Sequence, residues 1–322
     1  MIENNKMQSK YYGLSSREAF GKVILELGKK NENIVALSAD LAGSVKLNDF
    51  IKEFPDRFIN FGIAEQNMMG AAAGLTLAGK IPFACTYAVF SSMRACEQVR
   101  TDIAYNDLPV KIVSTHSGIT FGVAGATHQA IEDIGIFRSM AGMTIISPAD
   151  GVETASVIRA VAGLNKPAYV RLSRVKEKQV YEQDFAYNFG TPDLVAKGKD
   201  ILLIATGPQV GEAIGASMML KEKGIDAAVL NVSSIKPIGK KNLLKFLKEF
   251  PVAITVEQHN VINGLGSAVA EVIAENNIDI RFLRHGLYDT FTTSGPYREL
   301  LAYYQLDPQG INDTVLRFLD SV

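Results

Sequence analysis

Glu65 opens a helix-like segment of very small residues, EQNMMGAAAGLTLAG, just after a predicted strand. Its apolar neighbours Ile63, Ala64 and Met68 would keep water away, and burial favours the protonated form of a carboxyl group. A protonated glutamate can donate a hydrogen bond to a ligand. The ordinary alternative is a helix-start glutamate that accepts hydrogen bonds from backbone N–H groups. The local sequence leaves both interpretations open.

Two histidines lie in one glycine-rich stretch that follows an apolar run. His116 comes directly after the run at 110–114, and His128 lies a little further on, in GATHQ. A lone histidine is more often structural, but two in one loop at the end of a predicted strand favour a functional site. His259 and His285 lack such company, and we predict that both are structural.

Two arginines, Arg171 and Arg174, flank Leu172-Ser173 at the end of another apolar run. A guanidinium group suits two-point recognition of a phosphate or carboxylate. A structural ion pair is the alternative for each of them.

The elements that must position these residues are short apolar runs alternating with helix-like spacing. The runs cover 34–37, 82–86, 110–114, 143–146 and 168–172. Ser15 to Glu18 form a capping-box pattern, which predicts a helix start. Short buried strands alternating with helices indicate an α/β fold with a parallel sheet covered on both faces. Ligands bind such sheets at the carboxyl ends of the strands.

A charged and aromatic stretch at about 175–199 separates this region from a second set of α/β units. It has no clean period, and we predict an inter-domain linker with one edge strand. Further strands are predicted at 201–205, 227–231, 252–256 and 280–283, with helices ending near Lys223 and covering about 265–275. We therefore predict two doubly wound α/β domains, the larger at 1–185 and the smaller at 186–322.

Composition excludes several classes of protein. The 322 residues carry a formal net charge of −1 and no block of Lys and Arg, which argues against a nucleic-acid-binding protein. Two cysteines, Cys85 and Cys96, cannot form a disulfide framework or a zinc site alone. The polar start MIENNKMQSKYYG lacks the apolar core of a signal peptide, and no apolar run is long enough for a membrane span. We expect a soluble cytoplasmic protein.

Several segments together resemble the transketolase family, in its order and at its spacing. Those of the first half resemble its pyrimidine-binding domain: SADL (38–41), FPDRFINFGIAEQNMMGAAAGL (54–75), PFACTYAVFSSMRACEQVR (82–100), STHSGITFGVAGATHQAIEDIGIFRS (114–139), SPADGVE (147–153) and RLSR (171–174). In the second half, IATG and VEQHNVINGLGSAVAE are similar to the family's C-terminal domain. The resemblance implies a thiamine-diphosphate enzyme that transfers a two-carbon ketol unit between sugar phosphates.

The resemblance also implies roles for the cofactor-binding residues. Glu65 matches the glutamate that hydrogen-bonds N1′ of the cofactor's pyrimidine and so promotes removal of the C2 proton. Phe90 matches the aromatic residue that stacks on the pyrimidine ring, and Tyr87 its neighbour in the pocket. Asp40 matches an acidic residue near the cofactor.

The substrate-binding residues are implied in the same way. His116 and His128 match histidines that contact substrate hydroxyl and phosphate groups and assist proton transfer. Ser44 and Arg174 match residues of the substrate-phosphate site.

The sequence departs from the family's pattern at three points. Ala124 stands where the family has an aspartate that binds a donor-sugar hydroxyl, so donor specificity is open. Met93 stands where some members place a further aromatic residue. The family holds the cofactor's diphosphate through Mg²⁺ on a Gly-Asp-Gly motif of a preceding domain, and this sequence contains no Gly-Asp dipeptide. We therefore expect an N-terminal partner subunit that binds Mg²⁺ and the diphosphate, in a heterodimer or, more in keeping with the family, a heterotetramer.

Two other functions compete with a split transketolase subunit. The first is the β subunit of a 2-oxo-acid dehydrogenase E1, or an enzyme similar to deoxyxylulose-phosphate synthase. The E1 β subunit shares the architecture and often carries alanine near position 124. The segments AEQN, THQ and IEDIGIFRS are of transketolase character. A non-catalytic homologue is disfavoured, because Glu65, Phe90, His116, His128 and Arg174 are all retained.

Overall fold

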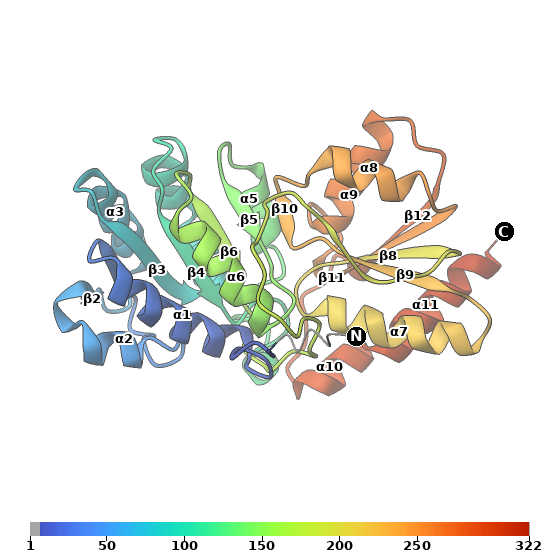
Figure 1. The fold of residues 1–322 in the computed structure, drawn as a ribbon, viewed down its shortest axis with the longest axis horizontal. Coiled ribbons are helices and arrows are strands. Elements are labelled where there is room, and N and C mark those ends of the chain that lie inside the picture. Colours follow the sequence, from blue (N-terminus) through green and yellow to red (C-terminus); the bar gives the residue numbers. More distant parts are fainter. Residues whose placement is uncertain (1–6, 322) are drawn as a thin grey trace, which may run out of the picture.

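Seven strands form the larger of two sheets in the computed structural model, which describes residues 7–321 (Figure 1). Their order is β10-β5-β6-β4-β3-β1-β2. The bounds are β1 Ile34–Ser38, β2 Phe58–Asn60, β3 Ile81–Tyr87, β4 Lys111–Thr115, β5 Thr144–Ile146, β6 Ala168–Arg171 and β10 Ser234–Lys236. All neighbouring strands run parallel except β10 and β5, which are antiparallel.

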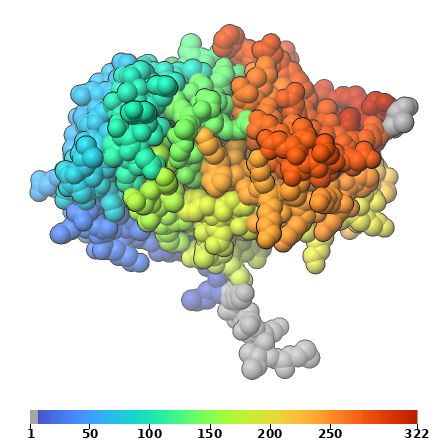
Figure 2. Space-filling view, turned by 90° about the horizontal axis from the view of Figure 1, so that it is seen from above, coloured from blue at the N-terminus to red at the C-terminus, as the bar shows by residue number. Residues whose placement is uncertain are grey.

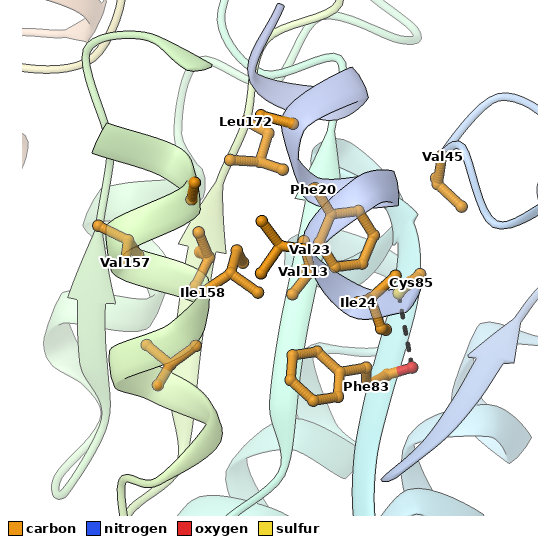
Figure 3. Close-up of a cluster of buried hydrophobic side chains, with 14 of the residues drawn as sticks. Phe20, Val23, Ile24, Val45, Phe83, Cys85, Val113, Val157, Ile158 and Leu172 are labelled. Carbon is orange, nitrogen blue, oxygen red and sulfur yellow. Dashed lines mark hydrogen bonds between the residues drawn. The ribbon is translucent and has the colours of Figure 1, made fainter. Parts of the chain in front are cut away.

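Helices cover both faces of this sheet, as predicted. They are α1 Ser16–Lys30, α2 Asn48–Glu53, α3 Glu65–Leu77, α4 Cys96–Gln98, α5 Asp133–Ser139 and α6 Gly151–Ala162. Figure 3 shows one face, where Phe20 and Ile24 of α1 and Ile158 of α6 pack over Phe83 and Val113 of the sheet. A second buried cluster, containing α3 and α5 residues, lies on the other face. Burial on both faces explains why the strands are continuous apolar runs.

The second sheet has five strands in the order β12-β11-β8-β9-β7. Its strands are β7 Asp193–Ala196, β8 Ile201–Ala205, β9 Ala227–Asn231, β11 Val252–Asn260 and β12 Arg281–Leu287; its helices are α7 Gln209–Glu222, α8 Lys240–Leu247, α9 Leu265–Glu275, α10 Tyr297–Tyr303 and α11 Pro308–Asp320. The predicted edge strand of the linker is confirmed as β7, which pairs antiparallel with β9. Two sheets, each with helices on both faces, confirm the predicted fold class of two doubly wound α/β units. Figure 2 shows the two halves of the chain side by side.

One strand does not follow the predicted division at 185/186. β10 comes from the second half of the sequence but pairs with β5 of the first sheet. The second half of the sequence therefore supplies one edge strand of the first sheet, and the boundary itself stays a prediction. The predicted absence of a signal peptide falls partly on residues 1–6, outside the described residues. Within residues 7–321, no helix combines the length and apolarity that a membrane span requires.

Candidate active site

The candidate side chains lie where four neighbouring parallel strands end. Asp40 follows β1, Tyr87 is the last residue of β3, His116 follows β4, and Arg174 lies three residues beyond β6. These strands are adjacent in the order β6-β4-β3-β1, so their carboxyl ends form one edge of the sheet. This edge is where α/β sheets bind ligands.

Glu65 is the first residue of α3, and its side chain is 1% exposed. The predicted desolvation is therefore present. Arg94 Nη1 donates a hydrogen bond to Glu65 Oε2 at 2.8 Å, forming an ion pair that the sequence did not reveal. Glu65 thus combines burial with a cationic partner, and the sequence predicted only the burial. The alternative of a glutamate that serves backbone donors has no counterpart among its described hydrogen bonds.

Five aromatic rings gather at this edge of the sheet, and Arg94 links one of them, Phe90, to Glu65. The ring of Tyr87 is stacked on that of Phe90 with centroids 5.7 Å apart, and it lies 3.9 Å from the ring of His116. His128 contacts Phe90 edge-on at 5.4 Å. Phe121 contacts His116 at 4.8 Å and His128 at 5.7 Å. The glycine-rich loop thus brings both predicted histidines onto the two aromatic residues predicted to hold a pyrimidine.

His116 has an unusual backbone conformation and a lowered side-chain pKa. Its φ of 63° lies in the left-handed region, as does that of Asp40 at 59°, and such strained residues cluster at functional sites. Burial, followed by the charges of Arg17, Arg174 and His128, lowers the pKa of His116 to about 3. At neutral pH the imidazole is therefore uncharged and can accept or donate a single hydrogen-bonded proton.

Two arginines and Ser44 form the other side of the site. Tyr87 donates from its hydroxyl to Ser44 Oγ at 3.1 Å, and Arg17 Nη1 donates to the Ser44 carbonyl at 3.2 Å. The guanidinium of Arg174 lies 4.9 Å from the ring centre of Phe121. Burial, followed by the charge of Arg174, lowers the pKa of Arg17, and within residues 7–321 its buried Nε has no hydrogen-bond partner. Two neighbouring cations with unused donors suit an anionic group such as phosphate.

Asp40 lies at the rim of the cluster. It is exposed, and its backbone N–H donates to Asn60 Oδ1 at 3.0 Å. The same amide oxygen accepts from the N–H of Gly62, in the loop that leads to Glu65. Asp40 is thereby connected to the loop before α3 through Asn60.

Arg171 and the other two histidines have structural partners. Arg171 is 2% exposed, and its Nε donates to Asp133 at 2.7 Å, which selects the ion-pair interpretation for this arginine. Gly135 N–H donates to Nε2 of His259, and Nδ1 of His259 is 2.6 Å from the carbonyl of Asn260. His285 Nε2 is 2.7 Å from the carbonyl of Gln305. Both histidines are buried away from the site, as predicted.

A buried glutamate ties the start of α1 to the segment after β6 and so brings Arg17 and Arg174 together. Glu177 Oε2 accepts from the N–H of Ser16 at 3.0 Å, and its Oε1 accepts from the Ser173 hydroxyl. Ser173 N–H in turn donates to Ser16 Oγ at 3.1 Å. Arg17 follows Ser16 and Arg174 follows Ser173. These hydrogen bonds therefore fix the distance between the backbone positions from which the two arginine side chains extend.

We expect Glu177→Gln to stabilise the chain selectively in alkaline solution. Burial raises the pKa of Glu177 to about 7 from its ordinary value of 4.5. Its contribution to the free energy of unfolding is therefore complete below about pH 4.5 and is lost as the pH rises through 7. The variant has no such loss, and its amide can donate to Ser173 Oγ. Its melting temperature should exceed that of the wild type near pH 8.5 but not near pH 5. The same substitution at exposed Glu222 is the control, and a pH-independent difference for Glu177→Gln would contradict this expectation.

Three residues of the site were missed from the sequence. Arg17 lies within the capping box that was used only to place a helix, and Phe121 lies within the glycine-rich segment. Arg94 is separated from Glu65 by 29 positions, and no local pattern connects them. A cation four residues beyond the stacking Phe90 was the available hint.

Comparisons with known proteins found relatives for both halves of the chain. Two family models match, "Transketolase, pyrimidine binding domain" at residues 13–178 and "Transketolase, C-terminal domain" at residues 190–311. A putative transketolase C-terminal section of Methanocaldococcus jannaschii is 45% identical over 97% of this chain and 98% of its own length. One subunit of the apulose-4-phosphate transketolase of Phocaeicola vulgatus is 39% identical over 95% and 98%. A solved structure described as "Split gene transketolase, inactive beta4 tetramer" has a TM-score of 0.89 and 42% identity, covering 96% and 99%.

These matches define the class of the protein. The chain belongs to the transketolase family and contains its pyrimidine-binding and C-terminal domains, as the sequence predicted. Family membership implies thiamine diphosphate as cofactor. The residues fit its aminopyrimidine, because Arg94 contacts both the buried carboxyl group of Glu65 and the face of the Phe90 ring, so that the two lie a guanidinium group apart. Within residues 7–321, no three or more His, Cys, Asp or Glu side chains are grouped to hold a metal ion.

Proposed function

We propose that the chain is the C-terminal subunit of a split, thiamine-diphosphate-dependent transketolase that transfers a two-carbon ketol unit between sugar phosphates. The observation that carries this proposal is one continuous cluster that joins Glu65 and Phe90 to the cationic pair Arg17 and Arg174. It thus combines side chains suited to a planar heterocycle with side chains suited to an anion. The proposed location is the cytoplasm, where the two free cysteines would stay reduced.

The cofactor half of the site would be formed mainly by α3 and the end of β3. Thiamine diphosphate, when bound, supplies the carbon nucleophile that carries the two-carbon unit. Glu65 would hold a proton between its carboxyl group and N1′ of the pyrimidine. Phe90 would stack on the pyrimidine ring, Tyr87 would line the side of the binding site, and Asp40 would lie at its outer edge. The family resemblance implies these roles, and the positions of the side chains are compatible with them.

The substrate half would be formed by the two histidines and the arginine pair. His116 is uncharged, so it would orient a sugar hydroxyl or accept its proton rather than neutralise a phosphate. His128 contacts the outer edge of Phe90 and would approach the substrate from the glycine-rich loop. Ser44, Arg17 and Arg174 would bind the substrate phosphate. Ala124 offers no hydrogen bond to a donor-sugar hydroxyl.

The proposed assembly includes an N-terminal transketolase subunit that holds Mg²⁺ and the cofactor's diphosphate. Two of the relatives support this, since one is described as a C-terminal section and the other as one subunit of a transketolase. We propose a heterotetramer, since sites of this family lie between subunits.

Arg174→Ala should raise KM for phosphorylated sugars far more than for unphosphorylated analogues. Loss of one charge-assisted hydrogen bond is worth about 1.5–3 kcal/mol, which is about ten- to more than a hundredfold in KM. Arg174→Lys keeps the charge without the planar fork and should fall between the wild type and the alanine variant. Steady-state kinetics of the assembled enzyme with both substrate types would measure this. Equal losses for the two types would instead assign Arg174 a structural role.

A further inference from the structure

Arg94 makes both contacts that the pyrimidine ring of the cofactor would make. Its guanidinium carbon lies 4.3 Å from the ring centre of Phe90, and its Nη1 donates to Glu65 Oε2 at 2.8 Å. A guanidinium group is planar and cationic, stacks on aromatic faces and donates several N–H hydrogen bonds. An aminopyrimidine bonded to a carboxyl group uses the same two surfaces.

We propose that Arg94 occupies the pyrimidine subsite of the cofactor-free chain and must leave it when thiamine diphosphate binds. The inference rests on the proposed function. It gives Arg94 a role in setting the affinity and the rate of cofactor binding. That role follows from the contact between Glu65 and Arg94, which the family motifs did not imply.

Arg94 can leave this site at a small cost in free energy. Leaving Glu65 without a partner would cost much more. The Arg94 side chain is 44% exposed, and its guanidinium has Glu65 as its hydrogen-bond partner in the described part of the chain. Arg94 can therefore move into water with little loss of interaction free energy. Glu65 is 1% exposed, and a buried carboxylate without a partner is strongly destabilising. A site that swaps one planar partner for another keeps Glu65 paired throughout.

The backbone around Arg94 suits such a movement. Arg94 ends a π-helical turn, Phe90–Arg94, in which the N–H of Ala95 donates to the carbonyl of Phe90 at 3.2 Å. Wide turns of this kind are uncommon and occur often at functional sites. Met93, beside Arg94, is 45% exposed, so the outer side of the turn is open to solvent.

Arg94→Met removes the competing group while keeping an apolar stem of similar length. The test uses the full chain co-purified with its Mg²⁺-binding partner subunit, with thiamine diphosphate and Mg²⁺ added. If Arg94 fills the subsite most of the time, its removal should tighten the apparent Kd by about tenfold, because that Kd scales inversely with the open fraction. Calorimetry would give the affinity, and stopped-flow fluorescence should show faster association.

The control is Arg100→Met, which removes the same charge from an exposed arginine in the next turn. It should leave both the affinity and the association rate at wild-type values. An unchanged or weaker Kd for Arg94→Met would overturn the proposal and make Arg94 a permanent partner of Glu65. If Arg94→Met does not fold, Arg94→Gln is judged by the same criterion. A wild-type complex that binds no thiamine diphosphate would overturn the proposed function, and the inference with it.

Discussion

Glu65→Gln should slow exchange of the C2 proton of thiamine diphosphate in the assembled complex by about 10²–10⁴-fold, the range for loss of a positioned acid–base group. Glutamine has the size of glutamate and can donate one hydrogen bond, but it cannot share a proton with N1′. Its amide oxygen can still accept the N–H of Arg94, which now pairs with Glu65. We therefore expect folding and partner assembly to be nearly intact while removal of the C2 proton becomes slow.

Hydrogen–deuterium exchange at C2, followed by NMR in wild-type and mutant complexes, is the direct measurement. Cofactor binding by calorimetry and co-elution with the partner are the controls for assembly. A mutant that assembles, binds cofactor and exchanges C2 at the wild-type rate would make Glu65 a structural residue. The thiamine-binding interpretation of α3 would then lose its main chemical support.

Much of the fold could be predicted because its strands are buried on both faces. β8 and β9 begin and end where their apolar runs do, and α9 covers the predicted 265–275, just after a glycine. β10 was missed because it has three residues, too few for a period to be visible, whereas the strand predicted just before the Glu65 segment is present as β2. β10 also pairs with β5, about 90 residues away in the sequence, and only tertiary packing can bring that pair together.

The candidate site was also predictable only in part. Glu65, Tyr87, Phe90, His116 and His128 were singled out through loop composition and family motifs, and the structure gathers them at one sheet edge. Their roles stay predictions, because geometry shows proximity and not chemistry.

The cationic groups around these residues could not be predicted from the sequence. The approach of Arg94 to Glu65, and of Arg17 to Ser44, joins positions 29 and 27 residues apart. These approaches depend on how α1, α3 and the π-helical turn pack, which no local pattern encodes. The expectation of a protonated Glu65 considered burial only and missed this nearby charge.

The second large effect concerns the partner subunit. Large apolar side chains are exposed around the site, with Ile63 at 77% and Val123 at 67%. Exposed apolar groups beside a binding site are typical of a surface that another chain covers. We therefore expect the purified chain to show no ketol transfer with thiamine diphosphate and Mg²⁺ alone, and to gain it on addition of the N-terminal subunit.

The most direct test follows a labelled two-carbon unit in that reconstitution. A ketose phosphate labelled at C1 and C2 is mixed with an aldose phosphate acceptor, and products are identified by mass spectrometry. The complete mixture should extend the acceptor by two labelled carbons without releasing CO₂, while either chain alone should give none. Extension of the acceptor by this chain alone would contradict the account. So would a complex that leaves sugar phosphates unchanged and decarboxylates pyruvate, which would instead indicate a 2-oxo-acid dehydrogenase subunit.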